Sequence, residues 1–343
     1  MNRSIPILLG IALVAALAAP AARADFIAAA DRLVAHQAPD GSWPGETGYT
    51  GSIVAGLVQA YEMTGTGAYK TSAESGGNYI LATAGGNFYG DEAYGLTRLS
   101  DVAPDPASNP WRTAVGDFYE AVRTGPGTST YLGWFSTIDP SVAAFYVASH
   151  VVAAHYVDEP DKDIWRDGLV DLLGDLDDGA DFPVMGLGVG TWALAKTGPM
   201  DATTIPGSGD LAGHALSELP DILAGHQVVP PDPCAGSFYW GFAHTPPSGG
   251  YASGYTEDAV FGTLGLMAAT DAGYAYKAEA DAGRNAIVAG IAPDGSLPEH
   301  LCYGGSSMHV FAGEALQTMI PEPATIGLLG TGLLLAVRRR RRS

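Results

Sequence analysis

Two segments near opposite ends of the chain carry almost the same residues, and this repetition is the strongest constraint on the fold. Residues 38–44 read APDGSWP and residues 292–298 read APDGSLP, so six of seven positions are identical. A second pair, AYKTSAESGGNYILA at 68–82 and AYKAEADAGRNAIVA at 275–289, shares its Ala-Tyr-Lys start. Internal repeats indicate structural units that bury apolar faces against neighbouring copies. Because the copies lie near both ends, we expect the first and last units to meet and close a ring.

Apolar residues recur at helical spacing along most of the chain, with Gly, Pro and Asp between the runs. Strand-like alternation is nearly absent. The expected helices cover residues 26–36, 52–63, 69–82, 90–101, 110–123, 140–157, 162–176, 184–196, 209–225, 257–271, 275–290 and 306–319. Paired into six hairpins, they predict an all-α fold, a single (α/α)6 toroid. Small residues such as Gly186, Gly188 and Gly190 would let the inner helices approach closely.

The N-terminal segment has the pattern of an export signal. Arg3 provides a positive start, residues 5–19 are mostly apolar, and Ala22-Arg23-Ala24 is a small-x-small cleavage site. This order predicts a secretory signal peptide at 1–24, removed from the mature protein. The toroid domain is then expected at 25–319, and a sorting segment at 320–343.

The C-terminal segment combines a short apolar run, Ala324 to Val337, with five arginines at 338–342. A membrane-spanning helix needs about 20 apolar residues, so this run is short for a span. The arginines would stay on the cytoplasmic side and stop transfer. We therefore expect a short transmembrane helix that anchors the exported precursor.

The order Pro321-Glu322-Pro323, apolar helix and Arg cluster resembles the PEP-CTERM sorting signal of Gram-negative bacteria. The resemblance covers only residues 320–343. It implies cleavage near Pro321, Glu322 and Pro323 by an exosortase, a membrane cysteine protease, and delivery to the cell surface or extracellular matrix. Such proteins accompany exopolysaccharide export. The implied partners are the secretion machinery, exosortase, the membrane before processing, and exopolysaccharide.

The charge of the mature body excludes one class of partner. Residues 25–320 contain 10 basic and 36 acidic residues, a formal charge of −26. A nucleic-acid partner is excluded because its phosphates would be repelled, and no basic run offers a site for a polyanion. The two cysteines, Cys234 and Cys302, form an even pair in an exported chain, which predicts a disulfide. The alternative is two buried thiols.

The stretch QAPDGSW at 37–43 resembles the QW motif of terpenoid-cyclase and prenyltransferase toroids. In that family the glutamine and the tryptophan clamp a turn between helices, and Gln37 and Trp43 match these positions. The second copy has Ile291 and Leu297 instead. The resemblance therefore supports the fold more than any chemistry.

The sequence Asp175-Leu176-Asp177-Asp178 resembles the Asp-x-Asp-Asp motif of class II terpene cyclases, where a protonated carboxylic acid protonates the substrate. Those enzymes have a second toroid and act from inside the cell, so terpene-cyclase-like activity is a distant alternative. Two other interpretations stay open. Asp175, Asp177 and Asp181 form a candidate Ca²⁺ loop, the one cofactor considered, or the segment is a solvated turn.

Two acidic pairs, Asp91-Glu92 and Glu257-Asp258, each begin an expected helix after an aromatic, glycine-rich loop. Helix capping alone explains acids at such positions. In a ring of hairpins, however, these helix starts line one mouth. Six-hairpin glycosidases place two carboxylates across such a mouth, where one protonates the leaving oxygen and the other activates water. Asp91, Glu92, Glu257 and Asp258 are therefore the candidate catalytic residues.

Aromatic side chains in the loops are candidates for contact with sugar rings. The long loop CAGSFYWGFAHTPPSGGY at 234–251 combines aromatics with glycines, and loops of this length are usually functional. The candidate substrate-binding residues are Tyr89, Tyr239, Trp240, Tyr251 and Tyr255.

Histidine and tyrosine side chains suggest a second chemistry. Polysaccharide lyases on α/α toroids use a Tyr or His base, and His150, His155 and Tyr156 lie on one expected helix, with His244 and His300 in loops. His150 and His155 are five positions apart and cannot share one helix face cleanly. A helix histidine is more often a core residue.

These observations favour a noncatalytic surface or extracellular-matrix component, with glycan binding as its candidate role. The alternative is a glycan-active hydrolase or lyase that acts on exopolysaccharide through paired carboxylates, so the sequence leaves open whether the protein is an enzyme. An enzyme needs the candidate carboxylates to converge within about 5–10 Å in an open pocket. A structural protein needs them only as helix caps.

Overall fold

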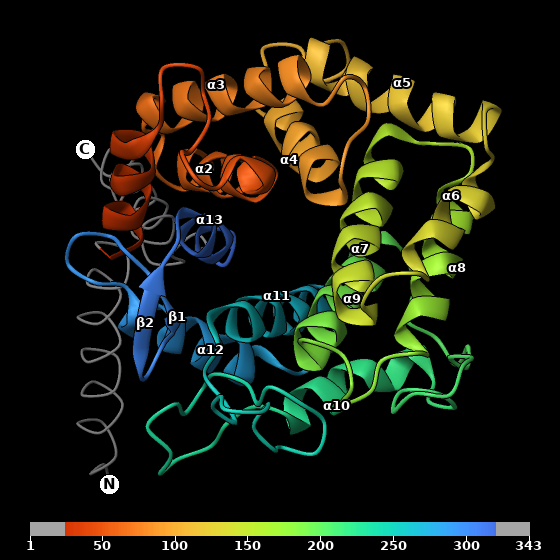
Figure 1. The fold of residues 1–343 in the computed structure, drawn as a ribbon, viewed down its shortest axis with the longest axis vertical. Helices are drawn as coiled ribbons and strands as arrows, with labels where there is room; N and C mark the ends of the chain where they lie inside the picture. The colour runs from red at the N-terminus through yellow and green to blue at the C-terminus, as the bar shows by residue number, and fades with distance from the viewer. Residues whose placement is uncertain (1–24, 320–343) are drawn as a thin grey trace, which may run out of the picture.

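The computed structural model describes residues 25–319, and these residues are mostly helical (Figure 1). The prediction of an all-α fold class is confirmed at this level. The expected signal peptide and sorting tail lie outside the described residues. Within residues 25–319, no helix combines the length and the apolar character needed to cross a membrane.

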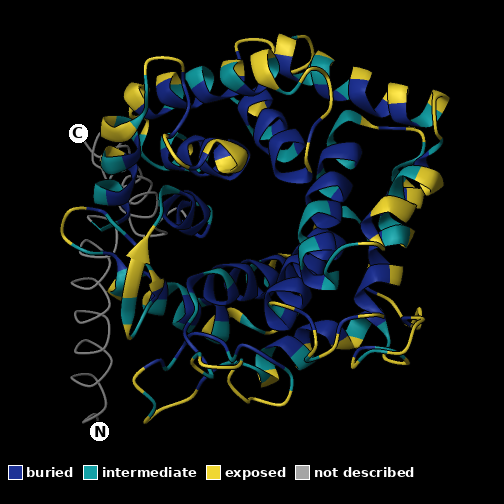
Figure 2. Cartoon of the chain, in the orientation of Figure 1, coloured by how far each residue is buried: buried dark blue, intermediate teal, exposed yellow. Residues whose placement is uncertain are grey.

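Six helices surround the centre of the molecule, and they form a closed series (Figure 1). They are α2 (Thr50–Thr64), α4 (Gly90–Asp101), α7 (Pro140–Val157), α9 (Pro183–Thr197), α11 (Thr256–Asp271) and α13 (His309–Leu316). Each packs against the next, and α13 packs against both α11 and α2. They are buried over most of their length (Figure 2).

A second layer lies outside these six helices and carries most of the exposed residues (Figure 2). It consists of a first helix at 25–36, then α3 (Gly67–Thr83), α5 (Pro110–Thr124), α6 (Thr128–Phe135), α8 (Lys162–Leu173), α10 (Leu219–Gly225) and α12 (Lys277–Gly290). Short 3-10 helices, η1 (Thr47–Tyr49) and η2 (Leu216–Glu218), precede α2 and α10. Outer and inner helices alternate along the chain except between α4 and α7, where two outer helices, α5 and α6, follow each other.

The repeated APDGS turns make equivalent contacts at successive places in the ring. The first copy follows helix 25–36 and packs on α3, because a Cβ on Gly41 would lie 2.2 Å from the carbonyl oxygen of Ser75. The second copy follows α12 and packs on helix 25–36, where a Cβ on Gly295 would lie 2.1 Å from the carbonyl oxygen of Ala28. The second turn thus joins the end of the chain to its beginning.

The turn that resembles a QW motif holds two outer helices together. The Gln37 side-chain amide donates to the carbonyl oxygens of Gly41 and Ser72, both at 2.9 Å. The buried Trp43 indole N–H donates to the carbonyl oxygen of Leu33 at 2.9 Å. These bonds connect helix 25–36 with α3.

Three local predictions differ from the structure. The helix expected at 209–225 begins only at Leu216, because residues 204–215 fold back through a bridge between Thr204 and Ala215. The Asp210 backbone N–H also donates to Leu176. Two further elements were not predicted from the sequence: α6, and the antiparallel hairpin of β1 (Pro298–His300) and β2 (Gly304–Ser307). Both β-strands are too short to show an alternating pattern.

Candidate functional site

The ring has two distinct mouths because its inner helices point the same way. Residues from the later turns of five inner helices, together with residues just after α13, line a common cavity, so the C-terminal ends of these helices gather on one side. We call this side the C-terminal mouth. The loops that lead into the inner helices lie on the other side, which we call the N-terminal mouth.

Four carboxyl groups surround one tyrosine at the N-terminal mouth. The pKa of Tyr49 is raised first by burial, and then by the charges of Glu257, Glu314, Asp91 and Glu46. Asp91 lies on α4 and Glu257 on α11, the second and fifth inner helices in the ring order. Charges from opposite sides of the ring therefore act on this one tyrosine.

Asp91 is a buried acid whose oxygen atoms lack hydrogen-bond partners among the described residues. Its side chain is only 2% exposed. Burial raises its pKa to about 7, with help from the nearby charge of Glu92. The backbone N–H groups of Ser52 and Glu92 lie near enough to offset the rise in part, but neither has the geometry of a hydrogen bond to Asp91. Glu92 behaves differently, since its Oε2 accepts a hydrogen bond from the Tyr89 backbone N–H at 2.9 Å. Glu92 thus caps α4, and Asp91 is left without such a role.

The acids on α11 and α13 also favour the protonated form. Burial and then the charge of Glu299 raise the pKa of Glu257 to about 7. Burial raises the pKa of Glu314 well above its usual value, and the charges of Glu257 and Asp91 add to this effect. Asp258 has no exposed surface and its pKa is also raised well above the usual value. Glu257 therefore faces the mouth, whereas Asp258 is enclosed among the helices.

These buried acids should make the protein more stable as the pH falls from about 7 to about 4. The pKa of Asp91 is about 7 when folded and near its ordinary value of 3.8 when unfolded. Between these values the unfolded chain loses the proton and the folded chain keeps it, so rising pH favours unfolding by about 1.4 kcal/mol per pH unit for this one acid. Thermal unfolding of the processed protein across this range measures the slope. Asp91→Asn should flatten the slope and raise the melting temperature near pH 8. An unchanged slope in Asp91→Asn would contradict this explanation.

An aromatic groove of about 570 Å³ lies beside Glu92 at the N-terminal mouth. Its lining includes Glu92 and two aromatic side chains that are half exposed, Tyr89 at 51% and Trp134 at 50%. The ring of Tyr89 lies 5.4 Å from that of Tyr146, measured between centroids. Trp134 comes from α6 and was not among the predicted contact residues.

A second aromatic pair lies near Glu257. Tyr251 and Tyr303 are both exposed, and their rings stack with centroids 4.4 Å apart and planes 16° apart. Tyr255 and Tyr251 both lie against His300, at 5.0 and 4.6 Å between centroids. The disulfide between Cys234 and Cys302 links the segment that carries Tyr303 to the long loop before α11, which carries Tyr251.

Two of the predicted contact residues are placed elsewhere. Trp240 is buried, and the Tyr239 ring stacks against His244 with centroids 3.9 Å apart. Neither presents an open ring face in the way that Tyr89 and Tyr251 do. His150 is a fully buried core residue that contacts the Tyr119 hydroxyl at 3.1 Å, and burial lowers its pKa to about 3.

The candidate calcium ligands do not converge in this structure. Among the described residues, the one group of His, Cys, Asp and Glu side chains with closely placed ligand atoms is Cys234, His300 and Cys302, and its sulfurs are joined to each other. The Asp177 carboxylate instead accepts the Gly179 backbone N–H at 2.7 Å. Asp175 and Asp181 are exposed. A metal role for Asp175, Asp177 and Asp181 stays a prediction.

Comparison with known proteins identifies the C-terminal segment. Residues 320–342 match the model of the PEP-CTERM protein-sorting motif. This motif marks an exported protein that is anchored in the membrane until exosortase cleaves it, and that then resides on the cell surface. The match confirms the resemblance noted at Pro321-Glu322-Pro323. No curated protein matches the chain.

Proposed function

We propose that the described residues form an (α/α)6 toroid that binds glycan across its N-terminal mouth on the cell surface. One observation carries the proposal. Among residues 25–319, seven large hydrophobic side chains are exposed, and five of them are aromatic residues in segments that lead into inner helices. These five are Tyr49, Tyr89, Trp134, Tyr251 and Tyr303. Exposed aromatic surface gathered in one region is typical of a binding site.

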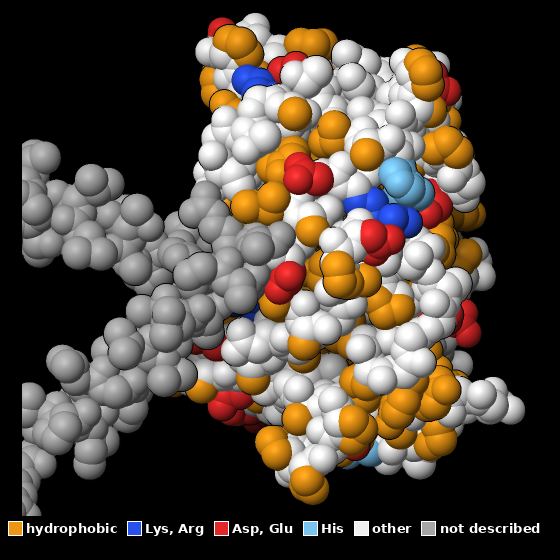
Figure 3. All heavy atoms as spheres, turned by 90° about the vertical axis from the view of Figure 1, so that its left-hand side faces the viewer, with side chains coloured by type: hydrophobic (Ala, Val, Ile, Leu, Met, Phe, Trp, Pro, Cys, Tyr) orange, Lys and Arg blue, Asp and Glu red, His pale blue; other side chains and the backbone are white. Residues whose placement is uncertain are grey.

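The chemistry of this mouth fits a sugar polymer. Tyrosine and tryptophan combine an apolar ring face with a polar tip, which suits the faces and hydroxyls of sugars. The two aromatic groups, around Tyr89 and around Tyr251, lie near Asp91 and Glu257 respectively. Protonated acids between them donate hydrogen bonds without adding charge. On the outer side of the molecule shown in Figure 3, a few basic side chains lie beside acidic side chains and histidine.

A second candidate function is glycan hydrolysis, and one observation favours it. A general acid must hold its proton near the working pH, and both Asp91 and Glu257 have pKa values raised to about 7. In that case one acid would protonate the glycosidic oxygen and the other would activate water. The enclosed Asp258 would take no direct part.

The binding proposal predicts that Tyr89→Ala combined with Trp134→Ala weakens glycan binding at least tenfold, about 1.4 kcal/mol. The processed protein would be purified from its own host and titrated with exopolysaccharide from that host by calorimetry. Ile164→Ala is the matched control, since Ile164 is an exposed apolar residue on the outer helix α8. Equal affinity of the double variant and the control would rule out the groove as the site.

The same samples separate binding from hydrolysis. New reducing ends that appear with the wild type, and disappear in both Asp91→Asn and Glu257→Gln, would establish the enzyme. Binding without any new ends would establish the noncatalytic role. Either acid variant should keep the fold, because each replaces a protonated acid with a neutral amide of the same shape.

A further inference from the structure

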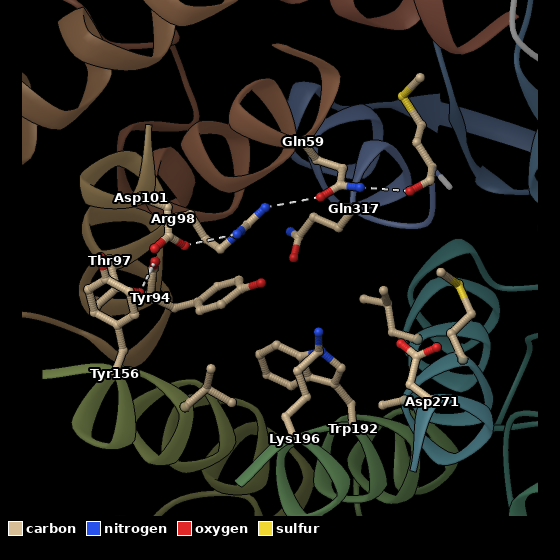
Figure 4. A pocket seen from close by; sticks show the side chains of 15 residues that line it. Gln59, Tyr94, Thr97, Arg98, Asp101, Tyr156, Trp192, Lys196, Asp271 and Gln317 are labelled. Carbon is tan, nitrogen blue, oxygen red and sulfur yellow. Dashed lines mark hydrogen bonds and ion pairs between the residues drawn. The ribbon is translucent and has the colours of Figure 1, made fainter. Parts of the chain in front are cut away.

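The C-terminal mouth holds a cavity of about 340 Å³ whose use the glycan proposal leaves open. Figure 4 shows side chains from α2, α4, α7, α9 and α11 reaching into it, together with Gln317 after α13. A cavity of only about 10 Å³ in the ring interior lies next to it, lined by Asp91 and by Tyr94, Trp192 and Gln317, which also line the C-terminal cavity. That space holds no more than about one water molecule, so the C-terminal cavity is a pocket distinct from the acidic mouth.

One wall of this cavity is fixed by hydrogen bonds. The Arg98 guanidinium contacts Glu62 at 2.5 Å, Asp101 at 3.0 Å and the side-chain oxygen of Gln59 at 3.0 Å. The amide nitrogen of Gln59 in turn donates to the carbonyl oxygen of Met319 at 2.7 Å. The charge of Arg98 is thus already balanced, and this wall is preorganised.

Three other polar groups that line the cavity have no partner within residues 25–319. No carboxylate of the described residues lies within ion-pair distance of the Lys196 ammonium. The Lys196 ammonium, the Tyr94 hydroxyl and the Asp271 carboxylate also make no hydrogen bond to another described residue. Burial, and then the nearby Arg98, lower the pKa of Lys196, and the charges of Asp271 and Glu62, both beyond ion-pair distance, offset this only partly, so the ammonium is incompletely compensated. Figure 4 shows all three side chains ending around the same open space.

Together these groups define what a ligand must offer. An anionic oxygen would balance the Lys196 ammonium, a hydroxyl donor would satisfy the Asp271 carboxylate, and a further oxygen would accept from Tyr94. The Gln317 side-chain amide makes only a long hydrogen bond, 3.4 Å, to the Ser52 carbonyl oxygen, so it can also donate a hydrogen bond to a ligand or accept one from it. A volume of 340 Å³ lies near the lower end of the range for small-molecule sites, about 300–1,000 Å³.

We propose that the C-terminal mouth binds a sugar acid, with its carboxylate on Lys196 and its ring hydroxyls on Asp271 and Tyr94. A sugar acid has one carboxylate and several hydroxyls on a small ring, which matches the three unpartnered groups. Neutral sugars leave Lys196 unbalanced, and simple carboxylates leave Asp271 and Tyr94 without partners. The site belongs to the mouth opposite the proposed glycan groove, so the test of this site does not depend on whether the groove binds glycan.

Calorimetry on the processed full-length protein tests this site with four probes: glucuronate, galacturonate, glucose and acetate. We expect at least one uronate to bind, and glucose and acetate to bind at least tenfold more weakly. Lys196→Gln should weaken uronate binding at least tenfold, whereas Lys196→Arg should retain most of it. Lys277→Gln is the matched control, because Lys277 lies on the outer helix α12 in an exposed ion pair with Asp281.

The outcomes decide the proposal and the source of the ligand. Equal uronate affinity in Lys196→Gln and the wild type would overturn the proposal. So would a uronate affinity no higher than the affinity for glucose, or the absence of binding by either uronate. A uronate trisaccharide that binds as well as the monomer would identify a polymer end as the ligand, and weaker binding would identify the free sugar acid. Tyr94→Phe keeps the ring and removes only the hydroxyl, so its loss of affinity supports the site even if Lys196 variants are unstable.

Discussion

Replacing both Cys234 and Cys302 with serine should lower the free energy of unfolding by about 4 kcal/mol. The disulfide joins two loops separated by 68 residues in sequence. A cross-link of that span removes much of the conformational freedom of the unfolded chain, and its absence returns that freedom. Urea unfolding of the processed protein, followed by circular dichroism, measures the loss.

Reduction of the wild type provides the control for this prediction. Dithiothreitol should reproduce the loss in the wild type and leave the double variant unchanged. The disulfide also holds the loop before α11 against the β1–β2 hairpin, where the Leu301 backbone N–H donates to Gly254 at 2.8 Å. Release of this link should weaken glycan binding through Tyr251 and Tyr303. A loss of stability below about 1 kcal/mol would show that the remaining hydrogen bonds alone hold the loops.

The helices and their order could be predicted because their signals are local. The bounds expected for α4 and α7 agree with the structure, and Pro140 marks the start of α7 as a proline in the first turn should. The closeness of the helices is also visible in the sequence: a Cβ on Gly188 would lie 2.6 Å from the Phe261 carbonyl carbon. The helix predicted over 209–215 is wrong, because this segment is held by long-range hydrogen bonds to the loop after α8, and such bonds leave no local sequence pattern.

The acidic mouth could be predicted only in part. Asp91 and Glu257 are recognisable because both begin apolar helices after aromatic loops. Glu314 was missed, although an isolated acid inside the apolar stretch HVFAGEAL is itself an unusual signal. Trp134 and Tyr303 were missed because their exposure depends on tertiary packing. A search for aromatics just before each inner helix would have found them.

The C-terminal cavity was invisible in the sequence. Arg98 and Lys196 each lie in the last turn of a helix, where a basic residue is common because it complements the helix dipole. Nothing local distinguishes the balanced Arg98 from the unbalanced Lys196. That difference depends on which helices become neighbours, and only the closed ring determines it.

Ring closure depends on close contact between the second helix of the chain and the last. A Cβ on Gly56 of α2 would lie 2.0 Å from the carbonyl oxygen of Gly313 on α13. Nearby, the buried Glu46 carboxylate accepts the backbone N–H groups of His309 and Val310, both at 2.8 Å, and so caps α13. Two contacts of different kinds therefore join the ends of the ring.

Gly56→Ala should accordingly destabilise the protein by about 3 kcal/mol, the upper end of the usual cost of overpacking, since the clashing atom is backbone. Gly116→Ala is a matched control on the outer helix α5, where an added Cβ meets nothing within 4 Å. Both changes gain up to about 1 kcal/mol of helix propensity, so the control should be stabilised. Opposite signs in urea unfolding would show that the contact between α2 and α13 holds the ring closed. If Gly56→Ala were as stable as the control, closure would rest on Glu46 and the APDGS turns instead.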